Sequence, residues 1–168
     1  MSSSQMTNRD DLVRRPMWKP VLIAFLTAAL VAGLGASVTE IGPWYHGLNK
    51  PSWQPPDWLF GPAWTLIFAC AALSASTAWI AARTHADRQW LIVLFCLNAL
   101  LNVLWSLLFF SLHLLGWAGV EVVALWLSIV ALIMLTRRFS TTSSLLLLPY
   151  LAWVSFAAVL NWTVASLN

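Results

Sequence analysis

Tryptophan and asparagine side chains within apolar segments are the groups of this sequence best suited to bind a ligand. Asn98, Asn102 and Trp105 follow one another at i, i+4 and i+7, so they share one face of a helix. Trp153 and Asn161 recur at i and i+8 and share a face of another helix. Indole rings stack on flat apolar molecules, and amides donate and accept hydrogen bonds, so such a set is typical of a pocket for a flat ligand with a polar edge. The alternative is that the asparagines only link helices, at under about 1–2 kcal/mol each.

A stretch rich in proline and tryptophan lies at residues 44–64 and reads WYHGLNKPSWQPPDWLFGPAW. Pro51, Pro55 and Pro56 lack the backbone N–H donor and fix φ, so the stretch is not the interior of a helix. A glycine–proline pair then favours a helix that starts at about Pro62. The sequence therefore predicts a stiff aromatic loop. It is either an anchor at the membrane–water boundary, where Trp and Tyr are enriched, or a rigid lid over a cavity between helices.

The remaining chemical groups are few and scattered. Cys70 and Cys96 lie in apolar segments and indicate neither a disulfide framework nor a metal site. The three histidines fall in different connections at no metal-ligand spacing, and the sequence holds no nucleophile-elbow, phosphate-loop or zinc-protease motif. Glu121 is the exception, because an ionisable residue inside a membrane helix is costly and indicates function. It lies near the predicted start of its helix, however, so we favour a structural role in which the side chain extends toward water.

Composition places the chain in a membrane. It has 168 residues, 60% hydrophobic and 9% charged, against about a quarter charged in a soluble domain. Spanning the hydrocarbon core takes about 20 apolar residues per helix, so the chain has room for five such helices in one membrane domain. We therefore predict an all-α membrane protein, a bundle of five transmembrane helices. The predicted spans are residues 20–41, 62–82, 90–111, 118–136 and 145–165, after a basic and disordered segment at 1–19.

The first predicted span also has features of a secretory signal peptide, because it follows basic residues. Its apolar run is longer than that of a signal peptide, and we therefore expect a retained helix. Ala29, Gly33 and Ser37 recur within it at a four-residue spacing that suits close helix packing. Residues 83–89 are predicted to form a short charged turn, and Pro149 is predicted to lie in the first turn of the last span.

The positions of the nine Lys and Arg residues predict the orientation. Eight of them fall on one side of the predicted bundle, and Lys50 alone falls on the other. Cytoplasmic loops hold the excess positive charge, so we expect a cytoplasmic N-terminus, with the aromatic loop and the C-terminus outside. No interleaving of basic and aromatic residues indicates a nucleic-acid surface. The eight residues are Arg9, Arg14, Arg15, Lys19, Arg83, Arg88, Arg137 and Arg138.

The aromatic loop resembles the signature of the tryptophan-rich sensory protein family, the bacterial relatives of the mitochondrial translocator (peripheral benzodiazepine receptor) protein. Similar patterns recur at residues 97–106, at the glutamate near the start of the fourth span, and at residues 148–161. The resemblance covers about residues 20–168. The family motif W-Y-x-x-L-x-K-P-x-W-x-P-P is matched at Trp44, Tyr45, Leu48, Lys50, Pro51, Trp53, Pro55 and Pro56.

The resemblance implies a five-helix bundle, usually dimeric, with a ligand cavity that opens toward the aromatic loop. Family members bind porphyrins and haem-related tetrapyrroles, so a tetrapyrrole is the expected ligand, no cofactor or metal is required, and the bacterial cell membrane is the expected location. Animal members also bind cholesterol, but no Lys or Arg follows Tyr150 as their sterol motif requires, so sterol binding is not favoured. The matching positions are Trp64, Asn98, Asn102, Trp105, Trp153, Ala157 and Asn161 in the cavity, and Trp44, Tyr45 and Trp53 in the lid.

Three functions are open to such a protein. The first is sensing or transport of a tetrapyrrole, and we expect a binding protein of this kind rather than an enzyme. The second is light-dependent oxidative degradation of porphyrin, for which Trp64 and Trp153 are the candidate electron donors. The third is a structural or regulatory membrane partner without a ligand.

Overall fold

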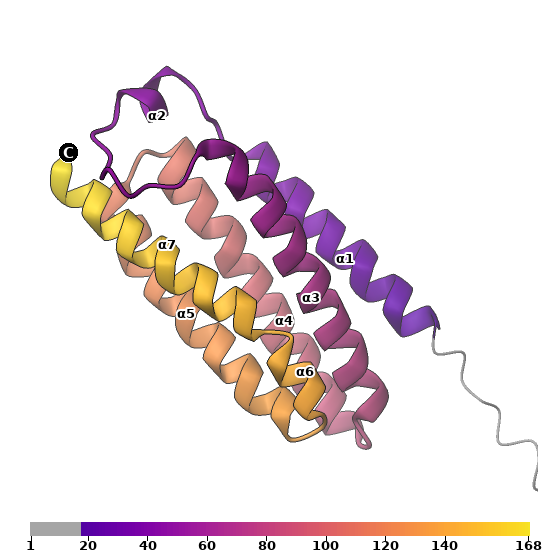
Figure 1. The fold of residues 1–168 in the computed structure, drawn as a ribbon. Coiled ribbons are helices and arrows are strands. Elements are labelled where there is room, and N and C mark those ends of the chain that lie inside the picture. The colour runs from indigo at the N-terminus through magenta and orange to yellow at the C-terminus, as the bar shows by residue number, and fades with distance from the viewer. Residues whose placement is uncertain (1–17) are drawn as a thin grey trace, which may run out of the picture.

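The computed structural model describes residues 18–168, and these form a bundle of five long helices (Figure 1). All five are long and apolar enough to cross a membrane, which confirms the predicted five-helix bundle. The predicted disordered segment at 1–19 lies outside the described residues, apart from its last two, which already belong to α1. The long helices are α1 (Trp18–Ser37), α3 (Phe60–Ala81), α4 (His85–Ser106), α5 (Leu115–Arg137) and α7 (Leu148–Leu167).

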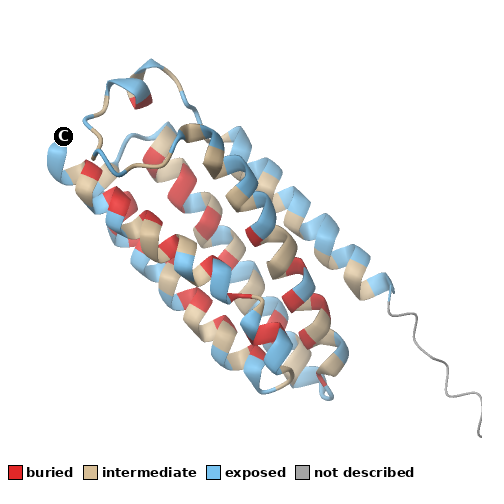
Figure 2. Ribbon diagram, in the orientation of Figure 1, coloured by how far each residue is buried: buried red, intermediate tan, exposed pale blue. Residues whose placement is uncertain are grey.

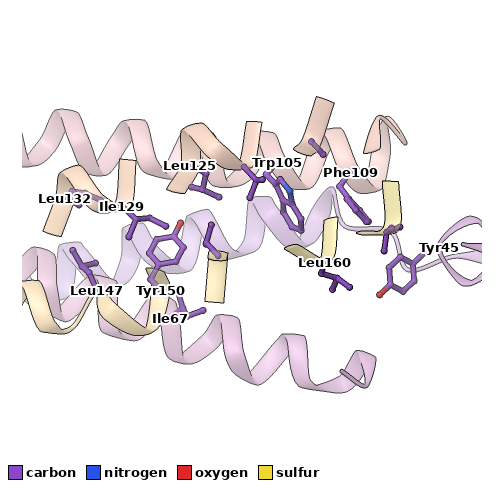
Figure 3. Packing of buried hydrophobic residues seen from close by; sticks show 14 residues of the cluster. Tyr45, Ile67, Trp105, Phe109, Leu125, Ile129, Leu132, Leu147, Tyr150 and Leu160 are labelled. Atoms are coloured by element: carbon purple, nitrogen blue, oxygen red, sulfur yellow. The ribbon is translucent and has the colours of Figure 1, made fainter. Parts of the chain in front are cut away.

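α5 is the helix around which the core is packed. It lies between α4 and α7, and its buried residues include Leu125, Ile129 and Leu132, each at most 1% exposed. They meet apolar side chains from the neighbouring helices in one continuous core (Figure 3). Burial of such side chains contributes about 1.5–3 kcal/mol each in water, but in lipid the packing contacts themselves stabilise the bundle.

α1 lies at the edge of the bundle against α3, and none of its residues is buried (Figure 2). Ala29, Gly33 and Ser37 are exposed, and a Cβ added at Gly33 would meet nothing within 4 Å. Ala28 and Gly35 belong instead to the half-buried side of the helix. The prediction that the three small residues pack closely on a neighbour is therefore wrong within this chain. Small residues occur on several sides of this helix, so their spacing could not decide which side packs.

The predicted charged turn at residues 83–89 is wrong, because a helix begins within it. Thr84 Oγ1 accepts a hydrogen bond from the backbone N–H of Asp87 at 3.1 Å, and the Asp87 carboxylate accepts one from the Thr84 N–H at 3.2 Å. This reciprocal cap satisfies donors that a helix start otherwise leaves unpaired. α4 therefore begins at His85, among polar residues that hydropathy assigns to a connection.

The aromatic loop is more structured than its prolines predict. It contains a short helix, α2 (Pro43–Gly47), whose proline lies in the first turn, where the missing N–H costs little. After an irregular stretch with a turn at residues 52–53, a 3-10 turn at Asp57–Leu59 leads directly into α3. α3 therefore starts at Phe60 and not at the predicted Pro62.

The last predicted span, residues 145–165, is shared between two helices. The short α6 (Thr141–Leu145) precedes α7, which begins at Leu148. Pro149 lies in the first turn of α7, as predicted.

Successive long helices run in opposite directions, so their connections gather at two ends of the bundle (Figure 1). Arg83 and Arg88 lie at the end where α3 meets α4, and Arg137 and Arg138 lie at the same end, where α5 meets α6. Lys50 lies at the opposite end, close to the C-terminus.

Candidate functional site

The segment between α1 and α3, residues 38–59, covers one end of the bundle and is called the lid (Figure 1). The Tyr45 hydroxyl is at its centre and donates a hydrogen bond to Asp57 Oδ1 at 3.1 Å. Gln54 Nε2 donates to the Tyr45 hydroxyl at 3.2 Å and to Asp57 Oδ1 at 3.3 Å. The Lys50 ammonium lies 3.4 Å from the centre of the Tyr45 ring. These contacts join distant parts of the lid, so its prolines are not the only source of its rigidity.

The electrostatics of the lid keep Tyr45 a hydrogen-bond donor. Burial, reinforced by the neighbouring negative charge of Asp57, raises the pKa of the Tyr45 phenol to about 12. The phenol therefore stays protonated at neutral pH. Partial burial lowers the pKa of Lys50, and the charge of Asp57 opposes that effect.

Hydrogen bonds and ring contacts fasten the lid to the bundle. The Asn49 N–H donates to Asn168 Oδ1 at 3.0 Å, and Asn168 Nδ2 donates to the Asn49 carbonyl at 3.1 Å. The Trp44 ring stacks on His113, with 3.8 Å between ring centres and 18° between planes. The first contact ties the lid to the end of α7, and the second ties it to the connection between α4 and α5. Ser111 Oγ also donates to the Val38 carbonyl at 2.7 Å, and the Trp53 ring packs on Phe156 of α7, so several contacts must separate for the lid to open.

A small cavity lies beneath the lid, between α4 and α7. Its volume is about 30 Å³, whereas ligand pockets usually measure about 300–1,000 Å³. The cavity is therefore too small for a ligand of ordinary size in this conformation, which we call closed. Figure 3 shows several of the aromatic and aliphatic side chains around it. The lining residues are Tyr45, Leu48, Lys50, Gln54, Phe60, Trp105, Phe109, Phe110, Ala157, Leu160, Asn161 and Val164.

Trp105 and Asn161 are predicted site residues that the structure joins directly. Trp105 Nε1 donates to Asn161 Oδ1 at 3.2 Å, and Asn161 Nδ2 donates to the Leu115 carbonyl at 2.9 Å. The two bonds link α4, α7 and α5 beside the cavity. Gly119 of α5 leaves room for these side chains, because a Cβ there would lie 3.1 Å from the Trp162 ring and 3.3 Å from Asn161 Nδ2.

Asn98 and Asn102 lie deeper in the bundle and are not part of the cavity lining. Asn98 Nδ2 donates to Ser128 Oγ at 2.8 Å, and Asn102 Nδ2 donates to the Tyr150 hydroxyl at 3.1 Å. Both asparagines are buried, so these bonds link α4 to α5 and to α7. In this conformation the two amides serve the helix-linking role that the sequence left open as an alternative.

Trp64 and Trp153 also lie outside the lining of the closed cavity. The Trp64 ring packs edge-on against Tyr150 at 6.0 Å, and the Trp153 ring packs edge-on against Phe60 at 5.6 Å. Phe60 itself lines the cavity, so it lies between Trp153 and that space. The expectation that three tryptophans and three asparagines line one cavity is corrected to Trp105 and Asn161 for this conformation. Trp153 Nε1 is buried and has no hydrogen-bond partner among the described residues.

The remaining predicted residues are divided between two places. Tyr45 and Ala157 line the closed cavity. Trp44 lines a separate open hollow of about 580 Å³, between the lid, the start of α5 and the end of α7. Trp53 is 46% exposed and packs edge-on against Phe156 of α7 at 5.9 Å. Ligand binding by any of these residues stays a prediction.

Glu121 of α5 is buried, and neither carboxyl oxygen has a hydrogen-bond partner among residues 18–168. Because both oxygens are also shielded from solvent, the expectation that the side chain extends to water is wrong. The Asn98–Ser128 bond sets the register of α4 against the antiparallel α5. Trp105 lies two turns after Asn98, and Glu121 lies two turns before Ser128. Because the two helices are antiparallel, Trp105 and Glu121 lie at the same level. An unpartnered acid within a membrane helix is a functional candidate.

Sequence reasoning did not identify several lining residues. Phe109 and Phe110 lie in a π-helical turn, Leu107–Ser111, that continues α4. Such a turn is common near functional sites, but it has no hydropathy signal. The sequence signal for Lys50 is its isolation from every other Lys and Arg, which placed it near the lid but not in the cavity.

The comparisons with known proteins agree with this architecture. The sequence matches the TspO/MBR family over residues 14–167. It is 38% identical to the "Tryptophan-rich protein TspO" of Chlorobaculum tepidum, over 90% of this chain and 99% of that protein. It is 33% identical to "Protein CrtK" of Rhodobacter capsulatus, over 86% of this chain and 90% of that protein. It is also 31% identical to the "Translocator protein" of Sus scrofa, over 89% of this chain and 90% of that protein. With these matches and its five long apolar helices, this integral membrane protein belongs to the TspO/MBR family.

Proposed function

We propose that this protein binds a porphyrin or a related tetrapyrrole beneath its lid and acts in tetrapyrrole sensing or transport. The observation that carries the proposal is the cavity between α4 and α7, which is lined by aromatic rings and by a few polar groups. Trp105 and Phe109 offer apolar ring surfaces to a flat macrocycle. Asn161 and Gln54 offer amide groups to its polar edge.

Binding requires the closed cavity to enlarge. A volume of about 30 Å³ holds about one water molecule, so the lid must lift before a macrocycle enters. The Asn49–Asn168 contact, the Trp44–His113 stack and the Ser111–Val38 hydrogen bond are among the contacts that separate in this step. The prolines of the lid limit the entropy lost when it closes again over the ligand.

We also propose an orientation and a location. Lys19, Arg83, Arg88, Arg137 and Arg138 lie at the end of the bundle opposite Lys50, which supports a cytoplasmic N-terminus and an external lid. The proposed location is the bacterial cell membrane. A second copy of the chain is the proposed partner, as the family resemblance implies, and α1, which has no buried residue, leaves surface for it.

The test is a titration of the purified protein with protoporphyrin IX in the dark, in which binding is monitored by tryptophan fluorescence. The proposal predicts saturable quenching and a higher unfolding temperature in the presence of porphyrin. Linear, non-saturating quenching without any thermal shift contradicts it and favours a structural or regulatory membrane partner without a ligand.

Light-dependent degradation of porphyrin is the second candidate function. It is favoured by Trp153, whose oxidisable indole packs on the cavity residue Phe60 and whose buried N–H has no partner among the described residues. Illumination of the complex in air distinguishes the two functions. Conversion of porphyrin to a new chromophore with repeated turnover supports the enzyme, and recovery of unchanged porphyrin supports binding alone.

A further inference from the structure

We propose that Lys50 makes the cavity selective for ligands that carry a carboxylate, by pairing its ammonium with that group at the cavity rim. This inference rests on the proposed tetrapyrrole-binding function and names the ligand class more closely: a tetrapyrrole with free acid side chains. Lys50 would then be a specificity-determining residue of the site.

The first observation is the position of Lys50. It lines the cavity beneath the lid, together with neutral polar residues such as Gln54 and Asn161. It is also the only Lys or Arg between residues 20 and 82. The other Lys and Arg residues that the structure describes lie at the opposite end of the bundle. Among the lining residues, therefore, Lys50 alone carries a full positive charge, and no lining residue carries a negative one.

The second observation is that the ammonium is held in place before any ligand arrives. Its Nζ lies 3.4 Å from the centre of the Tyr45 ring, a favourable cation–π arrangement. The backbone is held on both sides: Asn49 is bonded to Asn168, and the Gln54 N–H closes a turn on the Pro51 carbonyl at 3.0 Å. A group that is already positioned loses little entropy when it pairs with a ligand.

The third observation is that the ammonium can still accept a partner. Lys50 is only half-buried, and that partial burial lowers the pKa of its ammonium. One side of the charge faces the Tyr45 ring, and a carboxylate on the other side would add to that contact rather than replace it. Asp57 is the nearby acid that acts on Lys50, but its Oδ1 already accepts from Tyr45 and from Gln54.

The alternative is that Lys50 only braces the Tyr45 ring. The two roles differ in one measurable quantity, the ratio of affinities for an acid and its neutral ester. If Lys50 only braces the ring, replacing it changes both affinities by the same factor. If Lys50 pairs with a carboxylate, replacing it changes only the affinity for the acid.

The experiment compares protoporphyrin IX with its dimethyl ester, in neutral detergent and in the dark, for wild type and three variants. Lys50→Met removes the charge, Lys50→Arg keeps it, and Lys19→Met removes a lysine charge at the opposite end of the bundle as the control. We expect wild type, Lys19→Met and Lys50→Arg to prefer the acid by about fivefold, as a partly exposed ion pair allows, and Lys50→Met to show no preference. The preference of wild type should also fall as salt rises, which tests the pairing even if Lys50→Met does not fold.

An acid preference that is the same in wild type and in Lys50→Met overturns the inference, and so does a wild type that binds acid and ester equally at low salt. In both cases binding itself persists, so the proposed function stands. Failure of wild type to bind either compound contradicts the proposed function instead.

Discussion

The indole Nε1 of Trp105 donates a hydrogen bond to Asn161 Oδ1 at 3.2 Å, and this bond joins α4 to α7 beside the cavity. The same amide donates to the Leu115 carbonyl of α5 at 2.9 Å, so one asparagine holds three helices together. Both side chains also line the cavity. We therefore expect a ligand that enters there to compete for these groups, which would couple stability to binding at Asn161.

The first prediction follows from this bond. Asn161→Ala removes the acceptor of Trp105 and the donor to Leu115, and should lower the free energy of unfolding in detergent by about 1–2 kcal/mol. Ser166→Ala is the control, because Ser166 is exposed on the same helix and bonds only within it. The free energies of unfolding of the two variants are measured from their unfolding curves in detergent and compared. Equal stability of Asn161→Ala and the control would show that the link between the helices is unimportant.

The second prediction concerns the fastening of the lid. Asn168→Ala removes both contacts of its side chain with Asn49, whereas Asn49→Ala removes only a side-chain donor to the Leu167 carbonyl. We therefore expect faster hydrogen exchange in the lid, and faster porphyrin association, in Asn168→Ala than in Asn49→Ala. The rates are measured by mass spectrometry and stopped-flow quenching. Unchanged lid exchange in Asn168→Ala would mean that another contact keeps the lid closed.

The third prediction concerns the stiffness of the lid. Replacing Pro55 and Pro56 by glycine adds backbone freedom just before the 3-10 turn that leads into α3. Porphyrin affinity should fall, while the helix content measured by circular dichroism stays that of wild type. Unchanged affinity in the double variant would argue that the loop is only an interfacial anchor.

The fourth prediction concerns pH. The pKa of Tyr45 is raised to about 12, above its ordinary value near 10, so the neutral phenol is favoured in the folded lid. The resulting stabilisation is complete below pH about 10 and is lost as the pH rises toward about 12. Wild type should therefore show a late tyrosinate absorbance change that is accompanied by faster lid exchange, and Tyr45→Phe should lack both. Ionisation of Tyr45 near pH 10 without any change in the lid would refute this account.

The sequence was sufficient for the features that depend on hydropathy and on helical period. Five apolar runs predicted five helices, and the spacing of Asn98, Asn102 and Trp105 correctly placed them on one buried face. It was not sufficient for boundaries that side-chain bonds decide. The Thr84–Asp87 cap starts α4 within a polar segment, where hydropathy predicts a turn.

The division of the predicted site is a tertiary effect that the sequence cannot show. Asn102 and Asn161 are both buried asparagines on helix faces, but Asn102 meets the Tyr150 hydroxyl in the core, while Asn161 meets Trp105 beside the cavity. Which partner each amide finds depends on the level of its helix relative to its neighbours. No periodicity within one helix carries that information.

The central claim is that the ligand binds in the cavity between α4 and α7. Ala157 lines this cavity and is 8% exposed, whereas Ala152 lies on the exposed side of the same helix. Enlarging each to leucine therefore gives a matched pair, Ala157→Leu to fill the cavity and Ala152→Leu as the control. The decisive measurement is dark titration of both folded variants with protoporphyrin IX, followed by tryptophan fluorescence. The account predicts saturable quenching that is retained in Ala152→Leu and strongly weakened in Ala157→Leu; wild-type affinity in Ala157→Leu would contradict it.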